Sequence, residues 1–135
     1  MEDSIFTKII KGEIPSHKIY EDEHTLAFLD IFPAAEGHTL VVPKTQVEFI
    51  WDLPEEEYAT LMHSVQKVGK RLREVTGKHY VGTMVIGTDV PHAHVHVVPF
   101  ETVSDIKAVV SMKGRDEKEP NHAVLATLAE KLHFS

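Results

Sequence analysis

The chain has 135 residues, no cysteine and a formal net charge of −7 at pH 7, and 42% of its residues are hydrophobic and 26% charged. The absence of cysteine excludes disulfides, iron–sulfur clusters and thiolate zinc sites. The acidic balance disfavours a protein that binds nucleic acid polymers or anionic membranes, because both ligands need a basic surface.

The start of the chain carries no sign of a targeting segment. Met1, Glu2 and Asp3 are acidic on balance where a secretory signal is basic, and no apolar stretch follows them. No segment approaches the ~20 apolar residues of a membrane span. We therefore expect a cytoplasmic protein without a membrane partner. The length suits a single domain over residues 1–135, with a core over about 4–100 and a variable tail over 101–135.

The first predicted element is a short helix that Ser4 caps and Gly12 ends. Its apolar side consists of Ile5, Phe6, Ile9 and Ile10. Residues 18–20 and 25–31 predict two strands around a polar turn, and residues 39–42 predict a third strand that Pro43 closes.

The clearest helix runs from Pro54 to Gly77, with three glutamates in its first turn and apolar residues at spacings of three and four. Residues 80–86 and 92–100 predict the last two strands, and residues 111–120 predict a polar loop. Asn121 is expected to cap a final short helix, whose inward residues are Val124, Leu125, Leu128 and Leu132. These elements predict an α+β fold in which an antiparallel sheet of about five strands carries its helices on one face.

Residues 92–98 are the most informative segment. Side chains alternate between the two faces of a strand, so His92, His94 and His96 share one face while the apolar residues between them share the other. Histidines two positions apart are ~6.6 Å apart and the outer pair is ~13 Å apart, so one metal ion reaches two of them but hardly three. A metal site would need a further ligand, such as His38 or Asp89.

Phosphoryl or nucleotidyl transfer suits this row of histidines better than metal binding. A neutral imidazole is a good nucleophile near pH 7, and neighbouring imidazoles can donate hydrogen bonds to phosphate oxygens. The pattern therefore favours a central histidine that attacks phosphorus and flanking histidines that stabilise the developing charge.

Residues 92–98 fit the pattern His-φ-His-φ-His-φ-φ at every position, where φ is an apolar residue. This pattern is the signature of the histidine triad (HIT) superfamily, and the chain resembles that superfamily, in particular its Hint-like branch. Further segments are similar to the N-terminal half of that family and stand in the family's order: residues 5–15, 20–23, 27–31 and 37–44. The resemblance covers about residues 4–100.

This resemblance implies a homodimeric HIT fold that binds purine nucleotides and cleaves a bond at the α-phosphate. It implies that His94 is the nucleophile, that His92 and His96 surround the phosphate, and that His38 completes the catalytic group. It also implies that Asp30 accepts hydrogen bonds from the ribose hydroxyls. The apolar residues that match the family's base pocket are Ile5, Phe6, Ile9, Phe28, Leu29 and Ile31.

The chain departs from the family pattern at three places. Ser4, Thr7 and Gln46 stand where many relatives have zinc ligands, so we expect neither a metal nor another cofactor. The loop over residues 84–91 is short and lacks the usual Asn and Gln, which leaves Thr88 or Asp89 to contact the phosphate or the leaving group. Phe100 stands where an arginine is common.

The leading hypothesis is a hydrolase or transferase that acts on a purine nucleoside monophosphate joined to an amine, a phosphate chain or an acyl group. The alternative is a nucleotide-binding regulatory module with little or no turnover. A third reading, from another class, is a metalloenzyme that uses His92, His94 and His38.

Overall fold

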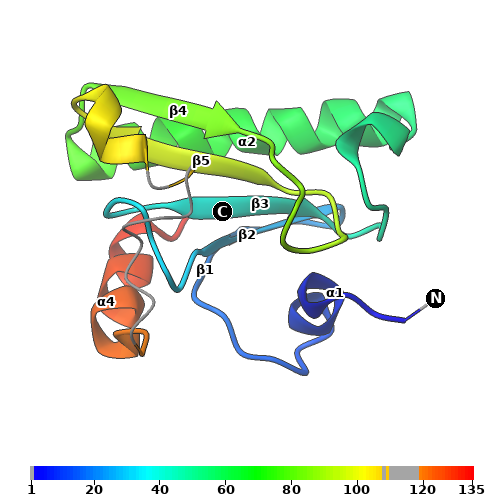
Figure 1. The fold of residues 1–135 in the computed structure, drawn as a ribbon. Coiled ribbons are helices and arrows are strands. Elements are labelled where there is room, and N and C mark those ends of the chain that lie inside the picture. The colour runs from blue at the N-terminus through cyan, green and yellow to red at the C-terminus, as the bar shows by residue number, and fades with distance from the viewer. Residues whose placement is uncertain (1, 108, 110–118) are drawn as a thin grey trace.

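The computed structural model describes residues 2–107, 109 and 119–135. Its centre is a five-stranded antiparallel sheet with the strand order β1-β2-β3-β5-β4 (Figure 1). The strands are β1 (Lys18–Glu21), β2 (Thr25–Leu29), β3 (Thr39–Pro43), β4 (Tyr80–Met84) and β5 (Val95–Phe100). The helices are α1 (Ile5–Ile10), α2 (Glu55–Thr76) and α4 (His122–Leu132), with two short 3₁₀ turns, η1 (Ile50–Asp52) and η2 (Val103–Ile106).

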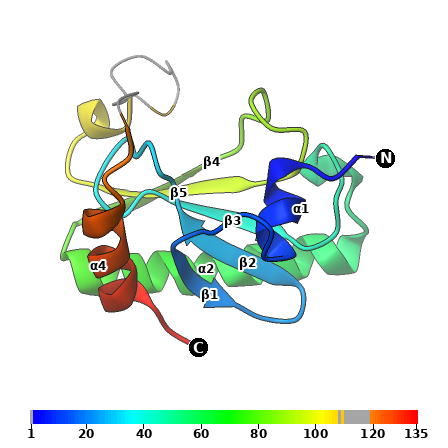
Figure 2. The same cartoon turned by 90° about the horizontal axis from the view of Figure 1, so that it is seen from below.

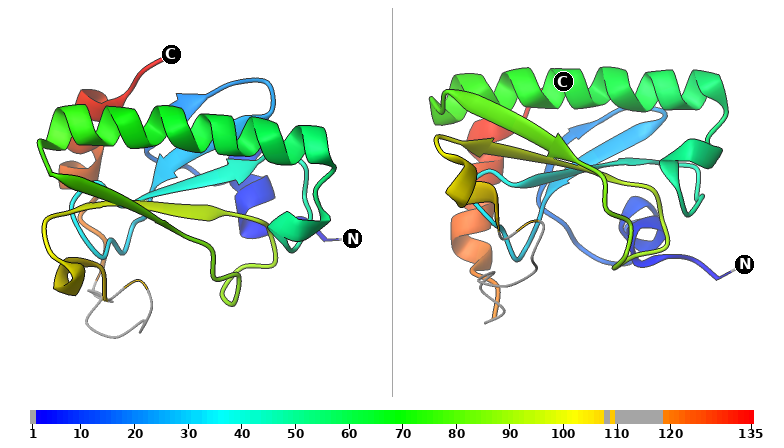
Figure 3. Two further views of the ribbon diagram at one scale, coloured as in Figure 1. Left: turned by 90° about the horizontal axis from the view of Figure 1, so that it is seen from above. Right: turned by 45° about the horizontal axis from the view of Figure 1, so that its top comes forward.

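The two faces of the sheet carry different helices. Leu26, Phe28 and Leu40 pack against Phe6 and Ile9 of α1. The alternate residues of the same strands join a larger core with α2 and α4. Figure 2 shows α1 in front of the sheet and α2 behind it, and Figure 3 shows α2 across the opposite face. The prediction that all helices share one face is therefore wrong, because the strands are buried on both faces and need cover on each.

Helix α2 confirms the strongest helix signal in the sequence. Glu55, Glu56 and Glu57 occupy the first turn, where the positive end of the helix dipole favours acidic side chains. Gly77 ends the helix in a left-handed conformation that glycine adopts without strain. The buried residues at spacings of three and four face the sheet: Leu61, Val65, Val68 and Leu72.

Helix α4 also forms where the sequence predicts it. The Asn121 side chain accepts a hydrogen bond from the Val124 amide, which caps the first turn. Leu125, Ala129 and Leu132 are buried against α2 and β1. The predicted inward position of Val124 is wrong, since this side chain is 57% exposed. A residue next to Leu125 lies about 100° around the helix from it, outside the buried stripe.

Three predicted strands are longer than the observed ones. Strand β2 ends at Leu29 and β4 ends at Met84, and β5 begins only at Val95. The pairing between β3 and β5 stops at Val41 and Val95. Pro43, further along β3, has no amide hydrogen to donate to residues 92–94. Of the predicted polar loop, residues 111–118 lie outside the described part of the chain. No helix among the described residues is long and apolar enough to cross a bilayer.

Gly37 and Gly77 provide a matched test of the loop that precedes β3. Both have positive φ, +92° and +70°. A Cβ at Gly77 meets nothing within 4 Å, whereas at Gly37 it lies 3.0 Å from Pro99 Cγ and 3.4 Å from Leu72 Cδ2. Gly77→Ala should cost about 1 kcal/mol of unfolding free energy from backbone strain alone. Gly37→Ala should cost about 2–4 kcal/mol because overpacking adds to the strain. Urea unfolding measures both, and equal losses would contradict the contact seen at Gly37.

Candidate active site

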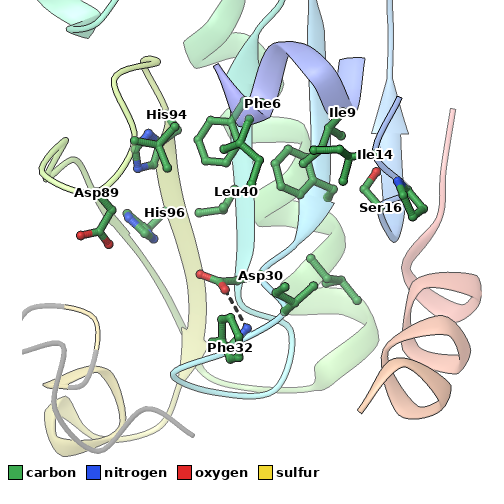
Figure 4. A pocket seen from close by; sticks show the side chains of 16 residues that line it. Phe6, Ile9, Ile14, Ser16, Asp30, Phe32, Leu40, Asp89, His94 and His96 are labelled. Atoms are coloured by element: carbon green, nitrogen blue, oxygen red, sulfur yellow. Dashed lines mark hydrogen bonds between the residues drawn. The ribbon is translucent and has the colours of Figure 1, made fainter. Parts of the chain in front are cut away.

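A pocket of about 550 Å³ lies between α1 and the sheet, and the histidine segment forms one end of it (Figure 4). Ten of the predicted site residues line it: Ile5, Phe6, Ile9, Phe28, Leu29, Asp30, Ile31, Asp89, His94 and His96. The lining residues that sequence reasoning did not assign to the site are Ile14, Pro15, Ser16, Phe32, Leu40 and Val90. Leu40 could have been found, because it lies two positions from His38 and therefore on the same face of the strand.

Strand register brings Asp30, His38 and His96 together. Leu40 is paired with His96 across β3 and β5, so His38 is the diagonal neighbour of His96 on the α1 face of the sheet. The Asp30 amide donates to the His38 carbonyl, which places Asp30 opposite His38 just beyond the end of β2. The Asp30 carboxylate lies 3.6 Å from His38 Nε2. Three consecutive strands of the sheet thus supply one buried polar cluster.

A backbone amide fixes the proton on His38. Ala34 N–H donates to His38 Nδ1 at 3.0 Å, so the neutral ring carries its proton on Nε2. His38 Nε2 lies 2.9 Å from His96 Nδ1 and donates to it. The neutral His96 ring then carries its own proton on Nε2. Since His96 lines the pocket, the hydrogen bonds from Ala34 through His38 to His96 determine which nitrogen of a pocket residue is the donor.

The same hydrogen bond bears on metal binding. Asp30, His38 and His96 each offer a ligand atom, and these atoms lie within 4.8 Å of one another. A metal ion needs the lone pair of His38 Nε2, yet that nitrogen carries the proton while Nδ1 accepts from Ala34. This cluster therefore fits a relay of hydrogen bonds better than a metal site. The metal reading with His92, His94 and His38 also lacks support, because these three do not form such a cluster among the described residues.

His94 is oriented by the backbone of the segment that contains it. Its Nδ1 lies 2.7 Å from the His92 carbonyl oxygen, and because a carbonyl only accepts, His94 donates from Nδ1. The lone pair of the neutral ring is therefore on Nε2. The Phe6 ring stands edge-on to His94 at a centroid distance of 5.1 Å and holds the imidazole from the α1 side. This arrangement fixes the orientation of an imidazole at the wall of the pocket and, in the neutral ring, leaves the Nε2 lone pair available.

His92 differs from its predicted position around a phosphate. It is fully buried and does not line the pocket. Its Nε2 donates to the Pro43 carbonyl at 2.8 Å, and its Nδ1 accepts from the Ser4 hydroxyl at 2.7 Å. Burial lowers the pKa of His92 below the ordinary value, and a positive charge on the neighbouring His94 would lower it further. Both ring nitrogens are thus engaged inside the protein, and His92 joins α1 and β3 to the histidine segment.

The Ser4 hydroxyl belongs to a closed polar network. Thr7 Oγ1 donates to Gln46 Oε1, Thr7 N donates to Ser4 Oγ, and Ser4 N donates to Gln46 Oε1. These are the places that hold zinc ligands in many relatives of the family that the sequence resembles. Zinc favours thiolate and imidazole ligands, so hydroxyl and amide groups that already satisfy one another do not fit that ion. The network instead ties α1, which forms one wall of the pocket, to the loop after β3.

The charges around the pocket are unusual for a site near phosphate. Its lining includes the carboxylates of Asp30 and Asp89, and none of the described lining residues is a lysine or an arginine. Thr88, the other predicted loop contact, is exposed and does not line the pocket. In Figure 4, Asp89 is drawn on the side of His94 and His96, away from Ile9 and Ile14. The pocket therefore has an apolar end and a polar end that contains histidines and acids.

The lowered pKa of His92 predicts a pH dependence of stability. As the pH falls, the unfolded chain takes up this proton first, near pH 6.5, and the folded chain only at lower pH. The stabilisation is therefore complete above about pH 6.5 and is lost below it, by at most about 1.4 kcal/mol per pH unit. His92→Gln should flatten this slope in urea unfolding between pH 7.5 and 5.5. The exposed His63→Gln serves as the control, and an equal slope in all three proteins would contradict the buried neutral His92.

Comparison with known proteins identifies relatives over most of the chain. The family model described as "HIT domain" matches residues 11–103. "Protein hit" of Bacillus subtilis is 36% identical, covering 99% of this chain and 97% of that protein. The yeast adenosine 5′-monophosphoramidase HNT1 is 38% identical over 70% of this chain and 61% of its own length. The Arabidopsis thaliana adenylylsulfatase HINT3 is 31% identical over 72% of this chain and 52% of its own length.

Solved structures of HIT-like proteins have the same fold as this chain. The crystal structure of a HIT-like protein from Bartonella henselae superposes with a TM-score of 0.79 at 30% identity, covering 96% of this chain and 94% of that one. The family match spans the sheet from β1 to β5 and includes His38 and the three histidines of residues 92–96. On this sequence match and this shared fold, the chain belongs to the HIT domain family.

Proposed function

We propose that this protein is a nucleotide hydrolase or transferase that cleaves conjugates of purine nucleoside monophosphates at the α-phosphate through a nucleotidyl intermediate on His94. The observation that carries the proposal is the hydrogen bond from His94 Nδ1 to the His92 carbonyl, which leaves the Nε2 lone pair on a histidine that lines the pocket. Two relatives, named as an adenosine 5′-monophosphoramidase and an adenylylsulfatase, support a reaction at this phosphorus atom.

The reaction has two steps. His94 Nε2 forms a bond to phosphorus while the bond from phosphorus to the leaving group breaks, and the leaving nitrogen or oxygen takes up a proton. Water then attacks the phosphorus of the nucleotidyl-histidine and loses a proton, and the bond to Nε2 breaks, which frees the nucleotide and restores His94. The proton on His96 Nε2, held there by the donor His38, hydrogen-bonds a phosphoryl oxygen and stabilises its developing charge.

The remaining walls of the pocket suit a nucleoside. The apolar end contains Phe6, Ile9 and Phe28, which offer a base two aromatic rings and aliphatic contact. Asp30 lies between this end and the histidines, and its Oδ1 already accepts from the Phe32 amide at 2.9 Å (Figure 4). A carboxylate held in this way is a fixed acceptor for ribose hydroxyls. The pocket volume of about 550 Å³ is within the range of small-molecule sites.

The proposed function implies two binding partners. A purine nucleotide conjugate is the proposed substrate, and a second copy of the chain is the proposed partner in a homodimer. Strand β4 supports the second proposal, because it is an edge strand whose outer backbone groups can pair with another strand. Tyr80 on that strand is 51% exposed and stacks on Phe100, which leaves an aromatic surface at the edge of the sheet.

His94→Asn should abolish turnover of an adenosine 5′-phosphoramidate and leave binding of AMP mostly intact. The substitution removes the covalent path, whereas affinity comes from the base and ribose contacts. Rapid quenching and mass spectrometry should detect an AMP adduct on His94 in the unchanged protein and none in the variant. His79→Asn, at an exposed position outside the pocket, is the control. Substantial turnover by His94→Asn would refute the mechanism, and binding without any adduct would favour the regulatory module.

Asp30→Ala should weaken nucleotide affinity by roughly 10- to 150-fold, because hydrogen bonds to a charged acceptor contribute ~1.5–3 kcal/mol. Asp30→Asn should retain the bond from the Phe32 amide and lose only the charged acceptor, which separates ribose binding from the local turn. Both variants should narrow the preference for AMP over 2′-deoxy-AMP, and the effect should appear in KM more than in kcat. Calorimetry with the two nucleotides measures this preference, and an unchanged ratio would exclude the ribose contact.

A further inference from the structure

The pocket that contains His94 and His96 carries an excess of negative charge. Asp30 and Asp89 are its carboxylates, and no described lining residue is a lysine or an arginine. Enzymes that handle charged phosphate chains usually place cationic side chains or metal ions against the phosphate oxygens. The phosphorus atom under attack retains its histidine donors, but an anionic leaving group would meet no cation among these residues.

Asp89 is the carboxylate that lies on the histidine side of the pocket. It lines the same pocket as His94 and His96, and Figure 4 draws it on their side of the cavity. It follows β4 in the loop that precedes the histidine segment, whereas Asp30 follows β2 and faces His38. Within the described part of the chain, the Asp89 carboxylate makes no hydrogen bond or ion pair, so its charge is not neutralised by a neighbour. An exposed carboxylate at this position raises the local concentration of cations and repels anions.

We propose, on the basis of the proposed function, that Asp89 determines specificity for the leaving group and that the preferred substrates are nucleoside 5′-phosphoramidates of amines with a second positive charge. Conjugates with anionic leaving groups, such as sulfate or a phosphate chain, are the disfavoured class. The leaving nitrogen takes up a proton as the phosphorus–nitrogen bond breaks, which gives it a positive charge until it departs as a neutral –NH2 group. A diamine therefore carries one more positive charge in the transition state than in the substrate, and the attraction to Asp89 is strongest there.

The experiment uses three adenosine 5′-phosphoramidates of nearly equal size and different charge. Their amines are n-butylamine, trimethylenediamine and β-alanine, which add a methyl, an ammonium and a carboxylate group at the same distance from phosphorus. The unchanged protein should show a kcat/KM that falls from the cationic to the neutral to the anionic conjugate. Each step should be roughly threefold to fivefold, the size expected of an ion pair open to water.

Variants at Asp89 separate charge from shape. Asp89→Asn should bring the three kcat/KM values close together, and Asp89→Lys should reverse their order. Asp89→Glu retains the charge and should retain the order. Glu130→Gln is the control, since it makes the same change in net charge at an exposed position on α4 outside the pocket. In the unchanged protein the preference should also shrink as salt is raised from 0.02 to 0.5 M, because salt screens exposed charges.

The outcomes separate this inference from the proposed function. If the unchanged protein cleaves neither the three conjugates nor a diadenosine polyphosphate, the proposed function is wrong. If it cleaves only the polyphosphate, the function stands and the inference about the leaving group is refuted. If it cleaves all three with equal kcat/KM, or if Asp89→Asn and Glu130→Gln keep the same order and spacing, the function stands and the role of Asp89 is refuted. Should Asp89→Asn lose all activity, the salt dependence of the unchanged protein and the Asp89→Glu variant still decide the question.

Discussion

The alternation of side chains through residues 92–98 is the constraint on which the site depends. Ala93, Val95 and Val97 are buried with α2, and this burial fixes which face the intervening residues occupy. A shift of one residue in register would expose these apolar side chains and bury the histidines against α2, which the polar rings could not satisfy. The core therefore holds the histidines at the α1 face as a consequence of packing, before any ligand is present.

Backbone groups then assign the histidine protons. A carbonyl accepts and an amide donates, so the contacts of His38, His92 and His94 with the main chain leave one neutral tautomer for each ring. The same types of side chain acquire different roles in this way. His92 becomes a buried link to α1, His94 keeps its lone pair on Nε2, and His38 passes its hydrogen bond to His96. Such fixed donors and acceptors need little reorganisation during a reaction.

This chain departs from the family pattern in the residues that hold α1 in place and in the loop expected to contact the leaving group. A network of Ser4, Thr7, Gln46 and His92 ties α1 to the rest of the protein with neutral hydrogen bonds. Since α1 supplies Phe6 and Ile9 to the pocket, this network also holds one wall of the pocket in place. The short loop before β5 contributes the carboxylate of Asp89 to the pocket and lacks the Asn and Gln that are usual there in the family. Substrate choice is thus expected to follow the charge of the leaving group.

The sequence by itself determined the element order, the long helix and the face shared by the three histidines, because these follow from local periodicity and from caps such as Ser4 and Asn121. The resemblance in residues 92–98 also indicated His94 as a site residue, and the resemblance in residues 27–31 indicated Asp30. Only the tertiary structure decided that α1 and α2 cover opposite faces, that β5 begins at Val95, and that His92 is engaged on both nitrogens. These features depend on strand order and on main-chain partners distant in sequence, such as Pro43 for His92 and Ala34 for His38, and no local pattern specifies such partners.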